Sequence, residues 1–348
     1  MPISASAQQV EKRQTSSEST VQEFRDPHEY QSLIRGADVR INLTGPGQYQ
    51  AKLTKVDLHR LWMQRGWSSL PYVVHSAPRR DRGFMSFLAD TQQAPSRHNG
   101  LELLPGTILA SAPGTEFHRR SPGGQWAAMS LTLEDLATAG QAIVGRELMT
   151  PRVTQIIRPP PHLMLRLLQL HKAAGQLAET APDILAHSEV ARAMEQALVQ
   201  AVVACLTADR VDDTKGHNHT RIPVMQRFER VLEAHQGETL YIPQVCAKIG
   251  VSERTLRLHC QEYLGMSPNK YLWLRRMNLA RRALAIADPK SASVTEMATA
   301  YGFWELGQFA VVYRKLFGEP PSVTLRRAPD DRPLMSARPP FELDVWSR

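Results

Sequence analysis

At 348 residues the chain is too long for one typical domain, which predicts two folded units. Its apolar share of 42% is ordinary for a globular protein, and no apolar run approaches the roughly 18 residues that a membrane span needs. The N-terminus has no signal-peptide core and the three cysteines show no metal-like or redox-like pairing, so we expect a cytoplasmic protein without a membrane partner. The net charge of +8 is concentrated in residues 221–327, where 16 Lys and Arg face 9 Asp and Glu, which indicates a polyanionic partner for that third.

The first half of the chain has the pattern of a β-rich domain. Residues 1–22 are rich in Ser, Gln and Glu and are predicted to form a disordered tail. From residue 23 to about 148, short apolar or alternating runs such as YVVHSA and LELLPGTILAS are separated by Gly, Pro and Asn. Many short strands with turn signals predict a β-sandwich or a small barrel.

Two amphipathic helices are predicted next, between residues 161 and 206, because apolar residues recur three and four apart. Their apolar faces are Leu163, Leu167, Leu170 and Leu177 in the first helix and Met194, Leu198, Val202 and Leu206 in the second. These faces either pack on the β-rich domain or form a dimer contact. Residues 207–220 have no apolar periodicity and are predicted to be the interdomain linker; its histidines His217 and His219 have no third ligand nearby.

The basic third contains an internal repeat. Residues 246–268 resemble residues 298–321, and each copy has a small residue, a Gly four positions later, a short turn and a second helix, as a helix-turn-helix does. Ser252 is a good N-cap for the second helix of the first copy, whereas Glu305 is a poorer cap in the second. Between the copies, residues 269–284 predict a helix about 24 Å long. With the width of a packed helix added at each end, such a spacer can place the second helices near successive major grooves, which lie roughly 34 Å apart.

Residues 221–327 resemble the DNA-binding domain of the AraC/XylS family of bacterial transcription regulators. The resemblance is carried by GVSERTLRLHCQEYLGMSP in the first copy, RRMNLARRAL between the copies, and VTEMATAYGFWELGQFAVVYRKLFGEPPSVTLRR at the end. It implies a seven-helix domain with two helix-turn-helix units, double-stranded DNA as partner and contact with RNA polymerase. It also implies an effector-binding or dimerising half before that domain.

We therefore expect an α+β protein with five parts along the chain. They are a disordered tail (1–22), a cupin-like effector and dimerisation domain with two C-terminal helices (23–206), a linker (207–220), an all-α DNA-binding domain with two helix-turn-helix units joined by a linker helix (221–327) and a flexible tail (328–348). The expected function is a ligand-responsive activator that acts as a homodimer and reads two adjacent major grooves.

Outward positions on the two second helices are the candidate DNA-reading residues. In the first copy, inward-facing Leu256 and Cys260 leave outward the set Arg254, Thr255, Arg257, Leu258 and Gln261. The resemblance points to Arg254, Arg257 and Leu258 as base-reading residues. An arginine fork can bond guanine O6 and N7 together, although either arginine can instead contact phosphate; Leu258 either touches a thymine methyl or makes no contact.

The second copy is poorer in polar chemistry. With Phe309 and Tyr313 inward, its outward positions are Leu306, Gly307, Gln308, Ala310, Val311 and Arg314. Gln308 suits adenine and Arg314 suits phosphate. On the linker helix, the basic group Lys270, Arg275, Arg276, Arg281 and Arg282 is expected to attract phosphate, with Arg276 as a candidate for internal support.

The β-rich half has weak motif support for its ligand. An unknown small-molecule effector is expected, and the candidate pocket residues are His59, Trp62, Trp67, His75, Phe117, His118 and Trp126. We predict no catalytic residue, no cofactor and no metal, because no GxSxG, phosphate-loop, HExxH or compact HxH motif occurs in residues 23–150. Two alternatives stay open: a ligand-independent architectural DNA-binding protein, and a cupin-like enzyme fused to a DNA-binding domain.

Overall fold

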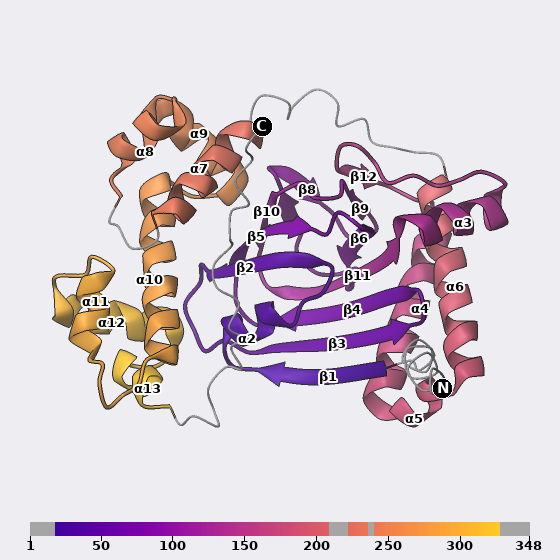
Figure 1. The fold of residues 1–348 in the computed structure, drawn as a ribbon, viewed down its shortest axis with the longest axis horizontal. Coiled ribbons are helices and arrows are strands. Elements are labelled where there is room, and N and C mark those ends of the chain that lie inside the picture. Colours follow the sequence, from indigo (N-terminus) through magenta and orange to yellow (C-terminus); the bar gives the residue numbers. More distant parts are fainter. Residues whose placement is uncertain (1–17, 209–221, 236–239, 328–348) are drawn as a thin grey trace, which may run out of the picture.

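The computed structural model describes residues 18–208, 222–235 and 240–327, which form a β-rich half and a helical half (Figure 1). Two antiparallel sheets make up the β-rich half. The seven-stranded sheet has the order β1 (Glu18–Phe24), β3 (Ala51–Leu58), β4 (Leu61–Ser68), β11 (Gly124–Thr132), β6 (Arg82–Leu88), β9 (Ile108–Ser111) and β12 (Gln155–Ile157). The five-stranded sheet has the order β2 (Ala37–Leu43), β5 (Tyr72–Pro78), β10 (Phe117–Ser121), β7 (Ser96–His98) and β8 (Leu101–Leu103).

Helices close one side of the seven-stranded sheet. The helices of this half are α2 (Pro27–Ser32), α3 (Leu133–Val144), α4 (Pro161–Thr180), α5 (Pro182–Ala186) and α6 (Ser188–Thr207). The predicted apolar faces of α4 and α6 pack inside the molecule, because Leu167, Leu198 and Val202 are fully buried in one cluster with Met63 and Phe87 of the sheet. By length and composition alone α6 is apolar enough to cross a membrane, yet it packs here as a core helix.

Strand alternation gives each sheet two different faces. On β6, Phe84 and Ser86 point toward the five-stranded sheet and line the space between the sheets, whereas Met85 and Phe87 point toward α4 and α6. The side of the five-stranded sheet that faces away from this space contacts the helical half. The β-rich architecture with two C-terminal helices agrees with the sequence prediction.

The helical half contains the expected seven helices. They are α7 (Ile222–Ala234), α8 (Ile242–Ile249), α9 (Glu253–Leu264), α10 (Pro268–Ile286), α11 (Val294–Ala300), α12 (Leu306–Phe317) and α13 (Pro321–Arg326). The pairs α8–α9 and α11–α12 are the two helix-turn-helix units, and α10 connects them (Figure 1). With 19 residues, α10 is about 28 Å long.

One predicted boundary is wrong, and others lie outside the described residues. The disordered tail was expected to reach residue 22, but Glu18 already begins β1, which pairs with β3 over its whole length. The polar composition of this edge strand hid it, because pairing rather than burial holds it in place. Most of the expected linker, with His217 and His219, and the whole expected tail 328–348 lie outside the described residues.

The two halves share one apolar core. A single cluster of buried residues includes Ile41 and Leu43 of β2 together with Phe228 of α7, Leu256 of α9 and Tyr271 of α10. The helical half therefore packs firmly against the β-rich half in this arrangement.

We predict that His171 makes the fold sensitive to acid. This α4 residue is fully buried against Phe87, and burial lowers its pKa to about 3. Between the ordinary histidine pKa of about 6.5 and that value, the unfolded chain binds a proton that the folded chain does not, so the free energy of unfolding falls as the pH falls. His171→Leu should remove about 2 kcal/mol of the loss in stability between pH 7 and pH 5.

Urea unfolding of both proteins at the two pH values measures this difference. His187→Leu, a substitution at the exposed end of α5, is the control and should keep the wild-type acid response. An equal loss of stability in the wild type and in His171→Leu would contradict the prediction.

Candidate nucleic-acid interface

The first helix-turn-helix unit has the local geometry that its sequence predicts. Gly250 ends α8 in the left-handed conformation, with φ of 72°, which a Cβ would disfavour. Ser252 then caps α9 by accepting a hydrogen bond from the backbone N–H of Thr255. Leu256 and Cys260 are fully buried, as expected. The turn and the cap fix which face of α9 points outward.

The outward face of α9 carries most of the predicted reading residues. Arg254, Arg257, Leu258 and Gln261 are exposed. Thr255 is half-buried, and its hydroxyl lies 2.9 Å from the Ser252 hydroxyl, so it takes part in the cap. Leu258, on the same face as the two arginines, is apolar and 60% exposed. This surface offers two guanidinium forks and one apolar contact to a groove.

The second unit begins less firmly and presents a more apolar surface. The Glu305 side chain does not cap α12, which agrees with the poorer capping expected of glutamate at this position. Leu306, Gly307, Gln308, Val311 and Arg314 are exposed. Ala310, which was also expected to face outward, is half-buried.

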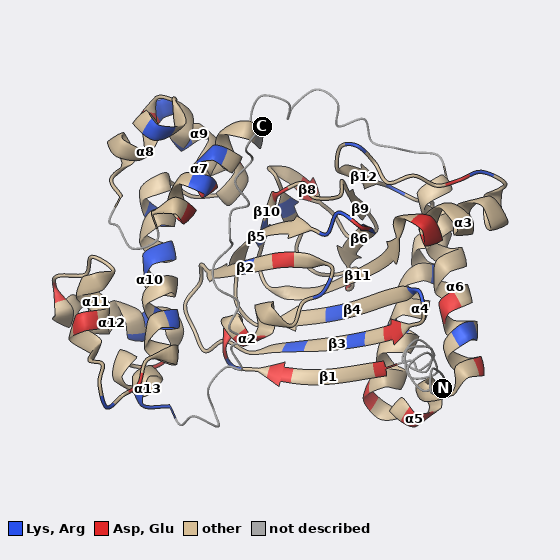
Figure 2. Cartoon of the chain, in the orientation of Figure 1, with Lys and Arg blue, Asp and Glu red and all other residues tan. Residues whose placement is uncertain are grey.

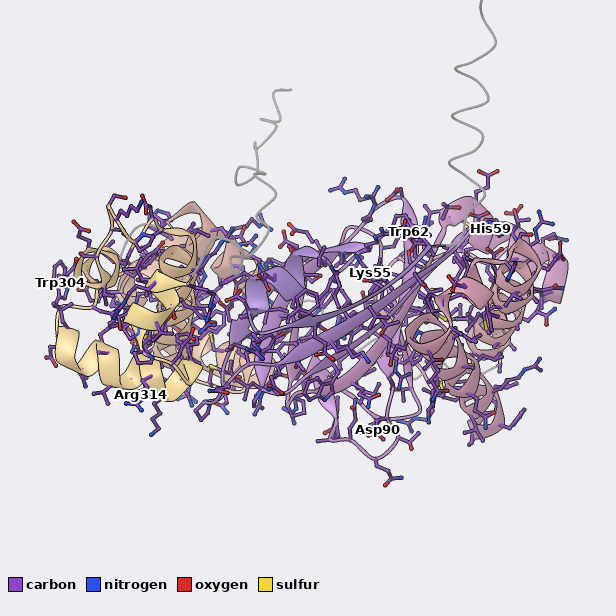
Figure 3. All side chains as sticks on the ribbon, turned by 90° about the horizontal axis from the view of Figure 1, so that it is seen from below. Lys55, His59, Trp62, Asp90, Trp304 and Arg314 are labelled. Carbon is purple, nitrogen blue, oxygen red and sulfur yellow. The ribbon has the colours of Figure 1, made fainter. Side chains whose placement is uncertain are left out.

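Trp304 is an exposed residue of this unit that the sequence interpretation missed. It is 77% exposed in the turn before α12, and it lies with Arg314 at the end of the molecule away from His59 and Trp62 (Figure 3). Its position in the turn between α11 and α12 could have indicated this exposure, since such a turn lies at the surface of the domain. Val311 is 69% exposed on the same unit.

The basic residues of α10 divide into two kinds. Figure 2 shows Lys and Arg along α7, α9 and α10. On α10, Lys270 is exposed and belongs to the first kind, which faces solvent. Arg276 is half-buried with its guanidinium 5.3 Å from the centre of the Phe303 ring, which fits internal support. The group expected to attract phosphate includes Arg281, but this member is buried instead and pairs with Asp26 and Glu319 at 3.4 and 3.3 Å.

A row of polar and charged side chains joins α7 to the five-stranded sheet. Arg40, His75 and His118 are cross-strand neighbours on β2, β5 and β10. The Arg40 guanidinium lies 2.6 Å from Glu233, and His118 Nε2 lies 3.0 Å from Glu229. Tyr271 on α10 donates a second hydrogen bond to Glu229 at 2.7 Å.

Glu229 is the centre of this row. Burial alone would raise the pKa of Glu229, but the hydrogen bond and the charge of His118 outweigh it and hold that pKa well below its usual range. Burial lowers the pKa of the neighbouring His75 to about 4. His75, Glu229 and Glu233 also place three metal-ligand atoms within 4.8 Å of one another. Because His118 and Tyr271 bond Glu229 and Arg40 pairs with Glu233, these groups serve as an interdomain contact.

Asn278 makes a second link between the halves. Its amide oxygen accepts from Leu43 N–H at 3.0 Å and its amide nitrogen donates to the Leu43 carbonyl at 3.2 Å. The side chain is 1% exposed, so both bonds lie away from water. Asn278 therefore fixes α10 to the edge strand β2.

The predicted pocket residues do not form one site. Phe117 and Trp126 line a cavity between the two sheets, as a pocket requires. His75 and His118 lie on the opposite face of the sheet, at the contact with α7. Trp62 packs under Arg82 and, with His59, lies at the far end of the β-rich half (Figure 3). Trp67 is 38% exposed on β4.

Comparison with known proteins supports the helix-turn-helix assignment. Residues 245–327 match a family model described as a helix-turn-helix domain. The chain is 44% identical over 98 residues to a probable thc operon regulatory protein of Rhodococcus erythropolis, covering 28% of this chain and 30% of that protein. It is 31% identical over 135 residues to XylDLEGF operon transcriptional activator 1 of Pseudomonas putida, covering 37% and 41%.

A solved structure is matched over nearly its whole length. It is a probable AraC family transcriptional regulator from Rhodopseudomonas palustris CGA009, 32% identical, and the match covers 32% of this chain and 98% of that one with a TM-score of 0.27. The two curated relatives, by contrast, are matched over less than half of their own length.

We predict that Glu229→Gln loosens the contact between the halves. The substitution keeps the shape of the side chain but removes the charge that His118 and Tyr271 bond, at a cost of about 2–3 kcal/mol in the free energy of unfolding. Amide hydrogen exchange in β10 and α10 should accelerate. Glu147→Gln, at an exposed position, is the matched control. It should change the free energy of unfolding by less than about 0.5 kcal/mol and leave the amide exchange rates as in the wild type. If β10 of the Glu229→Gln protein exchanged at the wild-type rate, the bond between Glu229 and His118 would not be what holds the halves together.

Proposed function

Because the chain belongs to the AraC family of transcription regulators, we propose that it binds promoter DNA through both helix-turn-helix units and that its β-rich half controls this binding in response to a small molecule. The observation that carries the proposal is the pair of units on one domain, each with its second helix exposed and the two joined by α10. One chain then reads two adjacent major grooves, with α9 in one and α12 in the other.

The two units contribute differently to this binding. Arg254 and Arg257 give α9 the chemistry for guanine, so α9 supplies base selection. On α12, Gln308 suits adenine and Arg314 suits phosphate, while Trp304 and Val311 add apolar surface. The second unit therefore adds affinity and shape reading more than base selection.

The control of binding passes through the docked interface. The row of Arg40, His75 and His118 meets Glu229 and Glu233, so a change in the sheet alters the contacts of α7 and α10 directly. Support for a regulatory link comes from this shared set of polar and charged side chains, of which Glu229 and His118 are buried between the two halves.

The proposal includes activation, contact with RNA polymerase, a cytoplasmic location and a homodimer. The relative in Pseudomonas putida is described as a transcriptional activator, which favours activation over repression. A dimer must use surfaces other than the apolar faces of α4 and α6, because those faces are occupied inside the molecule. The family is not a class of enzymes.

The experiment that tests this function is a binding titration of the full chain with DNA from upstream of neighbouring operons, competed by random DNA. We expect the chain to stay bound to one upstream sequence at an excess of random DNA that removes all other binding. Equal competition by random DNA would favour an architectural DNA-binding protein instead.

We predict that Arg257→Ala loses discrimination at one or two base pairs of the preferred site. Removing a bidentate guanine contact should cost about 1–3 kcal/mol on the preferred sequence and almost nothing on a sequence already changed at that pair. Quantitative titration against single-base variants of the site measures this. Arg146→Ala, an exposed arginine of the β-rich half, is the control. Uniform weakening on all sequences would assign Arg257 to phosphate.

Arg314→Ala should behave in the opposite way. An arginine that contacts phosphate weakens binding by a similar factor on every sequence when it is removed, and it lowers the slope of log affinity against log salt concentration by about 1. Titrations at several salt concentrations give the slope. A loss confined to one base pair, with the slope unchanged, would instead make Arg314 a base-reading residue.

A further inference from the structure

A cavity lies between the two sheets of the β-rich half. The empty space between its lining residues is about 490 Å³, a volume that includes open solvent at the mouth. Both sheets and α2 contribute to its wall. The lining residues are Tyr30, Ile34, Ala37, Val39, Ile41, Tyr72, Val74, Ser76, Phe84, Ser86, Phe117, Arg119 and Trp126.

Among the described residues that line the cavity, Arg119 alone carries a full charge. Its Nη2 donates to Ser86 Oγ at 2.7 Å, whereas its Nε has no hydrogen-bond partner among the described residues. No aspartate or glutamate lines the cavity within the described part of the chain. Burial lowers the pKa of Arg119, as expected for a cation with little compensation.

A second polar group faces the same space without a partner. Ser76 is 2% exposed, lines the cavity from β5, and its hydroxyl has no hydrogen-bond partner in the described residues. Ser76 lies opposite Phe117 on β10, two residues before Arg119. The two unpartnered groups therefore belong to neighbouring strands on the same wall.

These groups define the chemistry that would complete the site. A buried cation is costly unless an anion or several acceptors surround it, and the planar fork of arginine matches a carboxylate with two parallel hydrogen bonds. Apart from Ser86, which bonds Arg119, the rest of the wall is aromatic and aliphatic, so it favours an apolar body. A sugar or a polycation would leave most of its own polar groups unpaired against this wall.

We propose that the cavity binds a small organic carboxylate with an apolar body. Arg119 holds the carboxylate, Ser76 donates an additional hydrogen bond, and Phe84, Phe117 and Trp126 enclose the apolar body. The inference rests on the proposed function in one respect: the carboxylate is the effector only if the β-rich half controls DNA binding in response to a small molecule.

The position of Arg119 connects the site to the helical half. Arg119 and His118 are consecutive on β10, so their side chains point to opposite faces of the sheet. His118 bonds Glu229 on α7, 3.0 Å away. A ligand that draws Arg119 into the cavity therefore acts on the strand that holds α7.

The test compares acids with neutral isosteres on the full chain without DNA. Isothermal titration calorimetry with benzoate and hexanoate, and with benzamide and hexanamide, measures the contribution of the charge. At least one acid should bind about 10- to 100-fold more tightly than its amide, the range expected for hydrogen bonds to a charged group. Equal affinity of acid and amide, or no binding of either acid, would overturn the proposal.

Two variants test the role of Arg119 itself. Arg119→Met should abolish the preference for the acid while leaving the chain at least as resistant to urea as the wild type, because it removes a partly buried charge that no described aspartate or glutamate of the cavity wall pairs with. Arg97→Met, on the exposed side of the neighbouring strand β7, should retain the wild-type preference. Undiminished acid binding by a folded Arg119→Met protein would contradict the assignment.

The DNA titration keeps this inference separate from the proposed function. Selective DNA binding together with no carboxylate binding would remove the ligand and leave the regulator. Carboxylate binding that depends on Arg119, together with DNA binding that random DNA competes equally, would leave the ligand site and remove the sequence-specific regulator.

Discussion

The five-stranded sheet is one layer thick, and the alternation of its side chains is the constraint on which the rest of the molecule depends. On three adjacent strands, one set of residues lines the cavity while the next set contacts the helical half. Ile41, Val74 and Arg119 belong to the first set, and their neighbours Arg40, His75 and His118 belong to the second. Because both sets share the same backbone, a shift of these strands changes the cavity wall and the contact with the helices together.

The two helix-turn-helix units have the same fold but have diverged in chemistry. In the first, a serine cap and a left-handed glycine fix a face that carries two arginines. In the second, α12 starts without a side-chain cap, and the unit exposes Trp304 in the preceding turn and Val311 on the helix. Such exposed apolar groups suit contact with sugar edges, thymine methyls or another protein, whereas the first unit suits selective hydrogen bonding. A duplicated scaffold thus supports two types of surface.

Local features of the helical half could be predicted from sequence because they depend on residues close in the chain. The Ser252 cap, the Gly250 turn and the burial of Leu256 follow from spacing alone. Long-range pairing could not be predicted in this way. Arg281 resembled its basic neighbours on α10, but it meets Asp26, 255 residues earlier.

The same limit explains the incomplete prediction of the cavity. Phe117 and Trp126 were recognised as pocket candidates by their aromatic character, and both line the cavity. Arg119 was not among the candidates, because only the strand register shows that its side chain points into the cavity.

The edge strand β2 is covered by α10. Asn278 covers the outward N–H and C=O of Leu43, groups that would otherwise be open to pairing with another chain. Without the helical half, β2 would be an open edge able to pair with another chain, so α10 also protects the sheet from self-association through this strand.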